Sequence, residues 1–245
     1  MSESTISYVT GTDTDVGKTI TTAALAAALT ADGDTVAVYK PTQTGVSCDD
    51  PADMAEVARL SGVKNVHEGI RLRYPMAPDA AALRENRDLP SLADHAARIL
   101  ELAASHDHVL VEGAGGLLVT LDGQGNTIAE LAALVDQRVV ERAAAQGSDA
   151  LTIRTAFVVV CRSALGTLNH TGLTLEALHH RGVAAPALVI GAWPAAPSYV
   201  EVSNLDSLQG QGVNFLGTLP AGAAQLAPET FRAQASEWLK LPNWS

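Results

Sequence analysis

The stretch Gly11-Thr-Asp-Thr-Asp-Val-Gly-Lys-Thr19 decides the fold of this chain, because a glycine-bounded loop here joins a strand-like run to a helix-like run. The apolar residues 6–10 precede it and the helix-like residues 20–31 follow it. Glycines let a backbone wrap closely around a phosphate, and the free N–H groups and dipole of a helix N-terminus attract anions. In such loops a lysine, here Lys18, reaches the β- and γ-phosphates, and the next hydroxyl, here Thr19, binds Mg²⁺.

The spacing of this loop differs slightly from the strict signature. Five residues separate Gly11 from Gly17, where the signature has four. An ordinary glycine turn that caps a helix is the alternative interpretation. The order of strand, Gly-Lys-Thr and helix favours a site for a nucleoside triphosphate with magnesium.

Composition excludes several classes of function. The 245 residues suffice for one large or two small domains, and 47% hydrophobic with 18% charged residues is ordinary for a globular protein. A net charge of −11 argues against nucleic acid or anionic membrane as partner. No run reaches the roughly 18 apolar residues of a membrane span, and the N-terminus lacks a signal-peptide pattern. Cys48 and Cys161 form no C-x-x-C, so we expect a reduced, cytoplasmic protein.

Short apolar runs alternate with helix-length segments along the chain. This predicts an α/β fold with a doubly wound, mainly parallel sheet and helices on both faces, of the P-loop NTPase type. The predicted strands are 6–10, 35–39, 108–112, 156–161, 186–191 and 213–216. The predicted helices are 18–31, 51–60, 92–104, 127–134, 171–181, 199–209 and 229–239. No linker interrupts the pattern, so we predict a single P-loop domain over residues 1–245, with a charged helical insertion on the surface at 136–155.

Polar groups follow two of the predicted strands, where ligands of such sheets bind. Lys40-Pro-Thr-Gln-Thr-Gly45 would hold a fixed cation and hydroxyl donors over an anionic substrate group, although a solvated strand end is equally compatible. Glu112-Gly-Ala-Gly-Gly116 suits a Mg²⁺ ligand, with a turn cap as the alternative. Leu118 breaks the G-x-G-x-x-G pattern, so dinucleotide binding has little support.

The remaining acidic and histidine clusters have structural interpretations. Within Asp49-Asp50-Pro-Ala-Asp53, Asp50 is a candidate helix N-cap and Asp53 lies in the first turn, which the helix dipole tolerates. His106-Asp-His108 is typical of a solvated turn and His179-His180 of a helix end. The histidines form neither a zinc motif nor a catalytic triad by their spacing.

Taken together, the motifs resemble the dethiobiotin synthetase family, and the resemblance extends from residue 6 to about residue 225. It is carried by five segments whose order and spacing match: the Gly11–Thr19 loop, Lys40-Pro-Thr-Gln-Thr-Gly45, Val111-Glu-Gly-Ala-Gly-Gly116, Leu165-Gly-Thr-Leu-Asn-His170 and Leu219-Pro-Ala-Gly222. The combination is specific, whereas the loop alone would indicate only an NTPase.

The resemblance implies that the chain closes the ureido ring of dethiobiotin from 7,8-diaminononanoate and CO₂ (or bicarbonate) with ATP and Mg²⁺, by way of a carbamate and a carbamic–phosphoric anhydride. It implies catalytic roles for Lys18, Lys40 and Thr14, and substrate contacts for Lys40, Thr44 and Asn169. It implies metal ligation by Thr19, Asp53 and Glu112. The implied nucleotide contacts are Asp15, Val16, Gly17, Lys18, Thr19, Ile20, Glu112, Gly113, Ala114, Gly115, Gly191, Ala192, Pro220, Ala221 and Gly222.

The resemblance also implies a homodimer with the substrate at the subunit interface. Leu165–His170 would reach the substrate carboxylate of the other subunit through helix N-terminal amides and Asn169. Tyr74-Pro-Met-Ala-Pro-Asp79 resembles the proline-bounded loop beside the substrate chain. Two departures stand out. Segment 136–155 is longer than the usual connection, and Gly191-Ala-Trp-Pro194 replaces an asparagine that reads adenine, so other nucleoside triphosphates are also expected to serve.

Two other functions fit a P-loop. One is a related ATP-dependent, amidoligase-like enzyme acting on a polycarboxylate. The other is a nucleotide-switched ATPase that positions a protein or DNA partner, for which a net charge of −11 offers little DNA affinity. Hydrolysis that depends on diaminononanoate and bicarbonate would separate the synthetase from both.

Overall fold

The computed structural model describes residues 3–47, 50–146, 152–210 and 212–241. Its strands form a seven-stranded sheet in the order β3-β2-β4-β1-β5-β6-β7, and neighbouring strands run parallel. The strands are β1 (Glu3–Gly11), β2 (Val36–Gln43), β3 (Val66–Arg71), β4 (His108–Gly116), β5 (Thr152–Cys161), β6 (Ala187–Trp193) and β7 (Asn214–Pro220).

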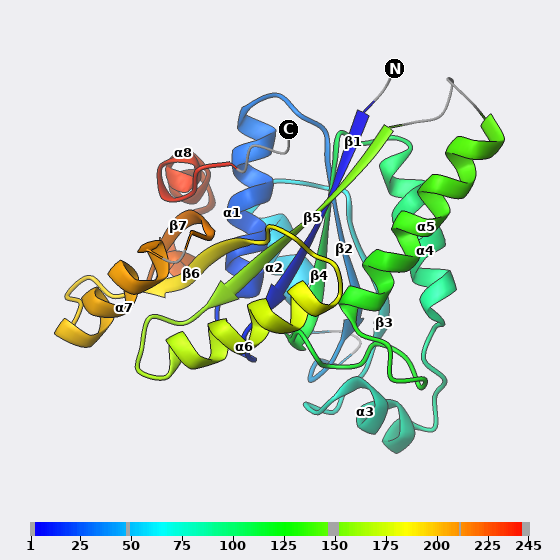
Figure 1. The fold of residues 1–245 in the computed structure, drawn as a ribbon, viewed down its shortest axis with the longest axis horizontal. Coiled ribbons are helices and arrows are strands. Elements are labelled where there is room, and N and C mark those ends of the chain that lie inside the picture. The colour runs from blue at the N-terminus through cyan, green and yellow to red at the C-terminus, as the bar shows by residue number, and fades with distance from the viewer. Residues whose placement is uncertain (1–2, 48–49, 147–151, 211, 242–245) are drawn as a thin grey trace.

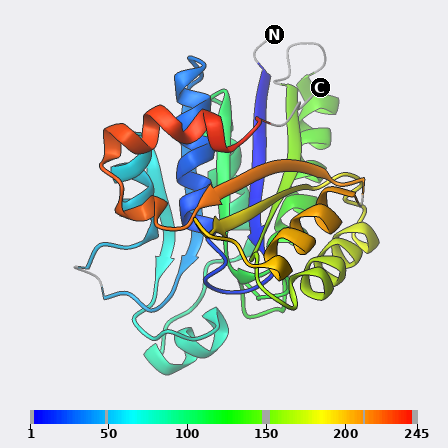
Figure 2. The ribbon, with the colours of Figure 1, turned by 90° about the vertical axis from the view of Figure 1, so that its left-hand side faces the viewer.

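Helices cover both faces of this sheet, so the predicted doubly wound fold is confirmed. They are α1 (Lys18–Ala31), α2 (Asp53–Ser61), α3 (Pro78–Glu85), α4 (Leu92–Ala103), α5 (Ile128–Gln146), α6 (Thr167–His180), α7 (Tyr199–Gly210) and α8 (Pro228–Trp238), with the 3-10 helix η2 (Ala223–Gln225) after β7. One face packs against α1, α2 and α8, and the other against α4, α5, α6 and α7 (Figure 1). Figure 2 shows α8 lying across α1 beside β7.

The continuous apolar runs of the sequence exist because each central strand faces two cores. In β5, Phe157 and Val159 enter the core beneath α4–α7, while Val158 and Val160 enter the core beneath α1, α2 and α8. A strand covered on both faces needs apolar side chains at successive positions. The alanines of α1, among them fully buried Ala23, let this helix lie close to the sheet.

Three elements were not predicted. One is the short 3-10 helix η2, and the other two, β3 and α3, lie at the β2 side of the sheet. The edge strand β3 carries the half-buried, polar residues His67 and Glu68, and so it lacks an apolar run. The helix α3 begins at Pro78, a favoured position for proline, and covers a small cluster with Ile70 and Leu72. In addition, β2 and β4 extend beyond their predicted ends to Gln43 and Gly116, so Lys40 and Glu112 lie within strands.

The charged segment 136–155 is not a separate insertion. Residues 136–146 continue α5 beyond the predicted helix 127–134, and residues 152–155 begin β5. The predicted cap at Asp50 is also wrong, because α2 begins at Asp53 with Ala52 at its N-cap. Predictions for Cys48, Asp49 and residues 147–151 fall outside the described residues.

The histidine predictions are partly confirmed. His179 and His180 do end α6. His108, however, is the buried first residue of β4 rather than part of a solvated turn, and its Nε2 lies 3.2 Å from Asp34 Oδ2. Within the described ranges, no helix combines the length and apolar character needed to cross a bilayer.

Candidate active site

The loop between β1 and α1 turns back sharply so that α1 begins at Lys18, as predicted. Gly17 takes a left-handed conformation (φ 97°) at the helix N-cap, and Asp15 is also left-handed (φ 57°). Thr12 N donates to Val160 O of the neighbouring strand β5 at 2.9 Å, which fixes the start of the loop. The loop therefore presents the N-terminus of α1 at the carboxyl edge of the sheet, the arrangement that binds phosphate groups.

The end of β6 supports this loop through direct backbone packing. A Cβ at Gly191 would lie 2.1 Å from Val16 O, and a Cβ at Gly17 would lie 2.6 Å from Gly191 O. Glycine at position 191 is therefore required by space and not by a positive φ. Asparagine at this position would displace the phosphate loop, whereas the neighbouring residue Ala192 is exposed.

Lys18 is buried beneath the loop. It is 7% exposed, and its Nζ donates to Asp13 O at 2.9 Å. Burial lowers the pKa of Lys18 to about 8, with a further lowering by Lys40, while Glu112 and Asp53 act in the opposite direction. A bound polyanion would favour the charged ammonium, since an opposite charge nearby stabilises it.

A second lysine lies between two carboxylates. Lys40 Nζ is 2.6 Å from Glu112 Oε1 and 2.7 Å from Asp53 Oδ2, and the Thr19 hydroxyl donates to the same Glu112 oxygen at 3.0 Å. Lys40 and Glu112 are 3% and 0% exposed. Burial alone would lower the pKa of Lys40, but Glu112 and Asp53 outweigh it and hold the pKa above its ordinary value. Four residues predicted for the site thus meet here.

The topology explains this convergence. Neighbouring strands β2 and β4 pair with Tyr39 opposite Val111, which places the following residues Lys40 and Glu112 level with each other. Asp53 arrives at the N-terminus of α2, where its backbone N–H donates to Gln43 Oε1 at 3.3 Å. Sequence reasoning had assigned no role to Gln43; its position in the Lys40 motif was the only available signal.

The residues present fit a divalent cation. Glu112 Oε2 is buried and has no hydrogen-bond partner among the described residues. The Thr19 hydroxyl donates to its other oxygen, Oε1, and Asp53 is joined to that oxygen through Lys40 Nζ. In the described part of the chain no three His, Cys, Asp or Glu residues form a ready metal cluster. Two carboxylates and a hydroxyl suit Mg²⁺, which commonly completes its shell with waters and substrate phosphates.

Most other predicted residues lie along the same edge of the sheet. Gly115 (φ 63°) is the second-last residue of β4, and a Cβ there would lie 3.3 Å from Thr14 Oγ1 of the loop. Ala221 N donates to Trp193 O at 2.7 Å, which joins the segment after β7 to the end of β6. Asn169 is different, because its side chain is exposed on α6. Sequence reasoning missed Arg162, which follows β5 and pairs with Asp13.

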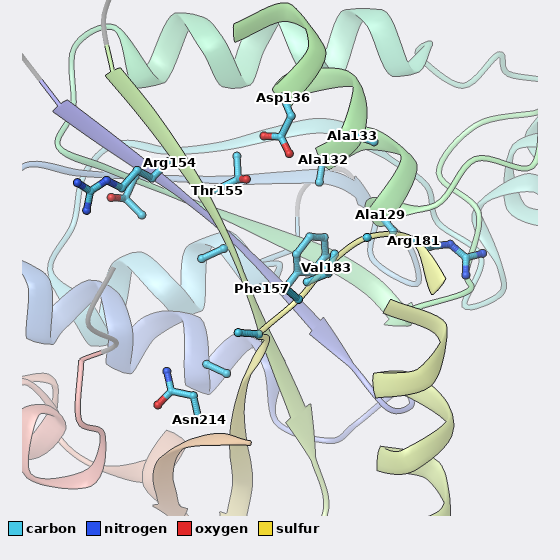
Figure 3. A pocket seen from close by; sticks show the side chains of 16 residues that line it. Ala129, Ala132, Ala133, Asp136, Arg154, Thr155, Phe157, Arg181, Val183 and Asn214 are labelled. Atoms are coloured by element: carbon cyan, nitrogen blue, oxygen red, sulfur yellow. The ribbon is translucent and has the colours of Figure 1, made fainter. Parts of the chain in front are cut away.

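A cavity of about 410 Å³ lies elsewhere, between α5, β5 and the connection from α6 to β6 (Figure 3). Asp136, Thr155, Phe157 and Arg181 are among its lining residues. None of the predicted site residues lines it, so we assign the chemistry to the carboxyl edge.

Comparisons with known proteins agree with this geometry. A family model described as an AAA domain matches residues 6–143. The ATP-dependent dethiobiotin synthetase BioD of Rhodococcus jostii (strain RHA1) is 47% identical over 234 residues, covering 95% of this chain and 94% of that protein. The protein of the same name from Streptomyces coelicolor is 45% identical over 235 residues, covering 96% and 91%.

Among solved structures, the septum site-determining protein MinD complexed with Mg-ADP, from Pyrococcus horikoshii OT3, has a TM-score of 0.56 at 17% identity. The match covers 97% of this chain and 96% of that chain. At this identity the likeness supports the fold alone.

The buried ion pair yields a stability prediction. Lys40→Met leaves Glu112 buried without its cation, so we expect the free energy of unfolding to fall by about 3–5 kcal/mol. Lys40→Met/Glu112→Gln should recover part of that loss. Urea denaturation measures both, with Arg59→Met as a control that removes an exposed ion pair to Glu56. A Lys40→Met variant as stable as the control would contradict the role of this pair.

Proposed function

We propose that this chain, which belongs to the family of ATP-dependent dethiobiotin synthetases, carries out ring closure with the two buried lysines that its sheet brings to one edge. Its activity is the ATP-dependent synthesis of dethiobiotin. The observation that carries the assignment to residues is the convergence of the phosphate loop with Lys40, Glu112 and Asp53.

The chemistry sets a clear electrostatic demand. One amine of 7,8-diaminononanoate adds to CO₂ and forms a carbamate. A carbamate oxygen then attacks the γ-phosphorus of the nucleotide, which releases the nucleoside diphosphate and leaves a carbamic–phosphoric anhydride. The second amine attacks the carbamoyl carbon and expels phosphate. The protein must therefore align the carbamate and the triphosphate, which repel each other. It must also stabilise the negative charge that shifts between them during phosphoryl transfer.

Each cationic group suits one of these anions. Lys18, at the N-terminus of α1, contacts the β- and γ-phosphates. Lys40 stabilises the carbamate, and the hydroxyls of Thr14 and Thr44 donate hydrogen bonds to it or to its neighbours. Asp15 orients the substrate amine or the nucleotide ribose.

Thr19, Asp53 and Glu112 hold Mg²⁺ in this proposal, and the bound ion offsets charge on the transferred phosphoryl group. Lys40 shares both carboxylates with the proposed metal. If Glu112 and Asp53 ligated Mg²⁺, the Lys40 ammonium would be available to the carbamate.

The nucleotide contacts beyond the phosphates remain part of the proposal. They lie at or just after the carboxyl ends of four strands, β1, β4, β6 and β7, and the residues are Val16, Gly17, Ile20, Gly113, Ala114, Gly115, Gly191, Ala192, Pro220, Ala221 and Gly222. We also propose that residues 1–245 act as one P-loop domain in the cytoplasm, which is supported by the continuous sheet and by the buried free thiol of Cys161.

The first test is the complete reaction. Dethiobiotin should form only with diaminononanoate, bicarbonate, Mg²⁺ and a nucleoside triphosphate together. Lys18→Gln should lose about 2–4 kcal/mol of transition-state stabilisation in kcat/KM, the scale of one preorganised electrostatic donor. Lys64→Gln, at an exposed lysine outside the site, is the matched control. Hydrolysis of the triphosphate that is indifferent to diaminononanoate would instead favour a switch ATPase.

Base selectivity is expected to be weak. Strong discrimination requires a polar group that pairs with one base edge and is left unpaired by another, and Gly191 and Ala192 supply only backbone groups. CTP and the other triphosphates should therefore support the reaction with efficiencies comparable to ATP. Ala192→Asn should shift the preference toward ATP. A wild-type preference for ATP above about 100-fold, or 2.7 kcal/mol, would show that other residues read the base.

We propose a homodimer that shares its active sites. Asn169 is exposed on α6, and the nearby residues Leu165 and Leu173 are 83% and 58% exposed. An exposed apolar patch around a polar side chain is typical of an interface. The segment would thus serve the substrate carboxylate of the second subunit.

Subunit exchange tests this arrangement. Lys18→Gln and Asn169→Ala should each be inactive as homodimers. After mixing, activity should rise toward about a quarter of the wild-type value, because half of the dimers are mixed and each contains one intact site. Absence of any recovery despite verified exchange would exclude shared sites, as would full activity of a monomer in sedimentation.

A further inference from the structure

Arg162 forms an ion pair with the phosphate loop but is not part of that loop. It follows directly after β5, and its Nη2 lies 2.6 Å from Asp13 Oδ2 in the loop. None of the motifs of the sequence includes it, and the proposed chemistry does not use it.

Asp13 is the residue through which this contact reaches the reactive groups. Its second carboxylate oxygen, Oδ1, accepts a hydrogen bond from Thr14 N at 2.7 Å. Its carbonyl oxygen accepts from Lys18 Nζ at 2.9 Å. One side chain of the loop is thus bonded to Arg162 and Thr14, while its backbone holds Lys18.

The backbone that carries Arg162 is itself fixed. The buried side chain of Asn204 in α7 donates to Ser163 O at 2.9 Å and to Ala164 O at 3.3 Å. Ser163 Oγ also donates to Glu201 Oε1 at 3.1 Å. Arg162 consequently acts from a rigid support and not from a free loop.

We propose that Arg162 is a positioning residue of the phosphate loop, which uses its ion pair with Asp13 to hold Thr14 and Lys18 where a nucleoside triphosphate is received. Charge-assisted hydrogen bonds are shorter and stronger than neutral ones, and here one bond orients a whole peptide segment. The inference rests on one part of the proposed function, namely that this loop binds the nucleotide.

The chain contains a matched control for this pair. Arg154 Nε lies 2.6 Å from Glu3 Oε1, and this pair also joins β5 to β1, but at their amino ends (Figure 3 shows Arg154). The side chains of the two pairs are also similarly exposed. Arg162 and Asp13 are 39% and 52% exposed, and Arg154 and Glu3 are 45% and 49% exposed. The Arg162–Asp13 pair includes a residue of the phosphate loop, whereas neither Arg154 nor Glu3 belongs to that loop.

The experiment compares Arg162→Gln with Arg154→Gln in the full-length chain. The measurements are the dissociation constant for Mg²⁺ with a non-hydrolysable ATP analogue by calorimetry, the KM values of both substrates, and Tm. We expect Arg162→Gln to raise both the dissociation constant and the KM of the nucleotide about tenfold. The KM of diaminononanoate and the Tm should equal those of Arg154→Gln. Asp13→Asn, which keeps an acceptor for Thr14 N, should reproduce this, and the double variant should be no worse than either single one.

Two outcomes would overturn the inference: nucleotide binding in Arg162→Gln equal to that in Arg154→Gln, or additive effects of Arg162→Gln and Asp13→Asn. Arg162→Lys should restore part of the affinity, because it keeps a charged donor toward Asp13. Nucleotide binding is measured without turnover, so failure of the wild type to form dethiobiotin would reject the proposed function without bearing on this result.

Discussion

The buried ammonium of Lys40 between Glu112 and Asp53 is the interaction on which the rest of the site depends. A carboxylate as deeply buried as Glu112 is costly without a cation, and the cation must arrive from the neighbouring strand. This requirement fixes β2 against β4 in one register and brings the N-terminus of α2 toward both. The charges that serve the proposed chemistry are therefore also charges that the fold must satisfy.

Packing constrains the site from its other side. Gly17 and Gly191 leave no space for a side chain between the phosphate loop and the end of β6. The phosphate loop and the end of β6 therefore touch through main chain. A side chain at either glycine would displace the loop, whereas Ala192 beside them is exposed to solvent.

Sequence reasoning located the fold and most of the site because both follow local rules. The glycine loop predicted the start of α1 at Lys18, and the apolar runs predicted six of the strands at the positions where the structure has them. It failed at β3 because an edge strand half exposed to solvent needs no apolar run. It could not find the pairing of Arg162 with Asp13, because the two are far apart in sequence and their contact arises from the β1–β5 pairing.

The proposed site holds two buried lysines in a chain whose net charge is −11. Such a chain repels a polyphosphate at long range, so the proposed attraction acts at close range, through Lys18 for the phosphates and Lys40 for the carbamate. Burial strengthens their fields, because the surrounding dielectric is low. The same burial lowers the pKa of Lys18 to about 8, whereas the paired Lys40 keeps a raised pKa. The two lysines thus differ: the carboxylates of the fold stabilise the charge of Lys40, whereas in the proposed site a bound phosphate would stabilise that of Lys18.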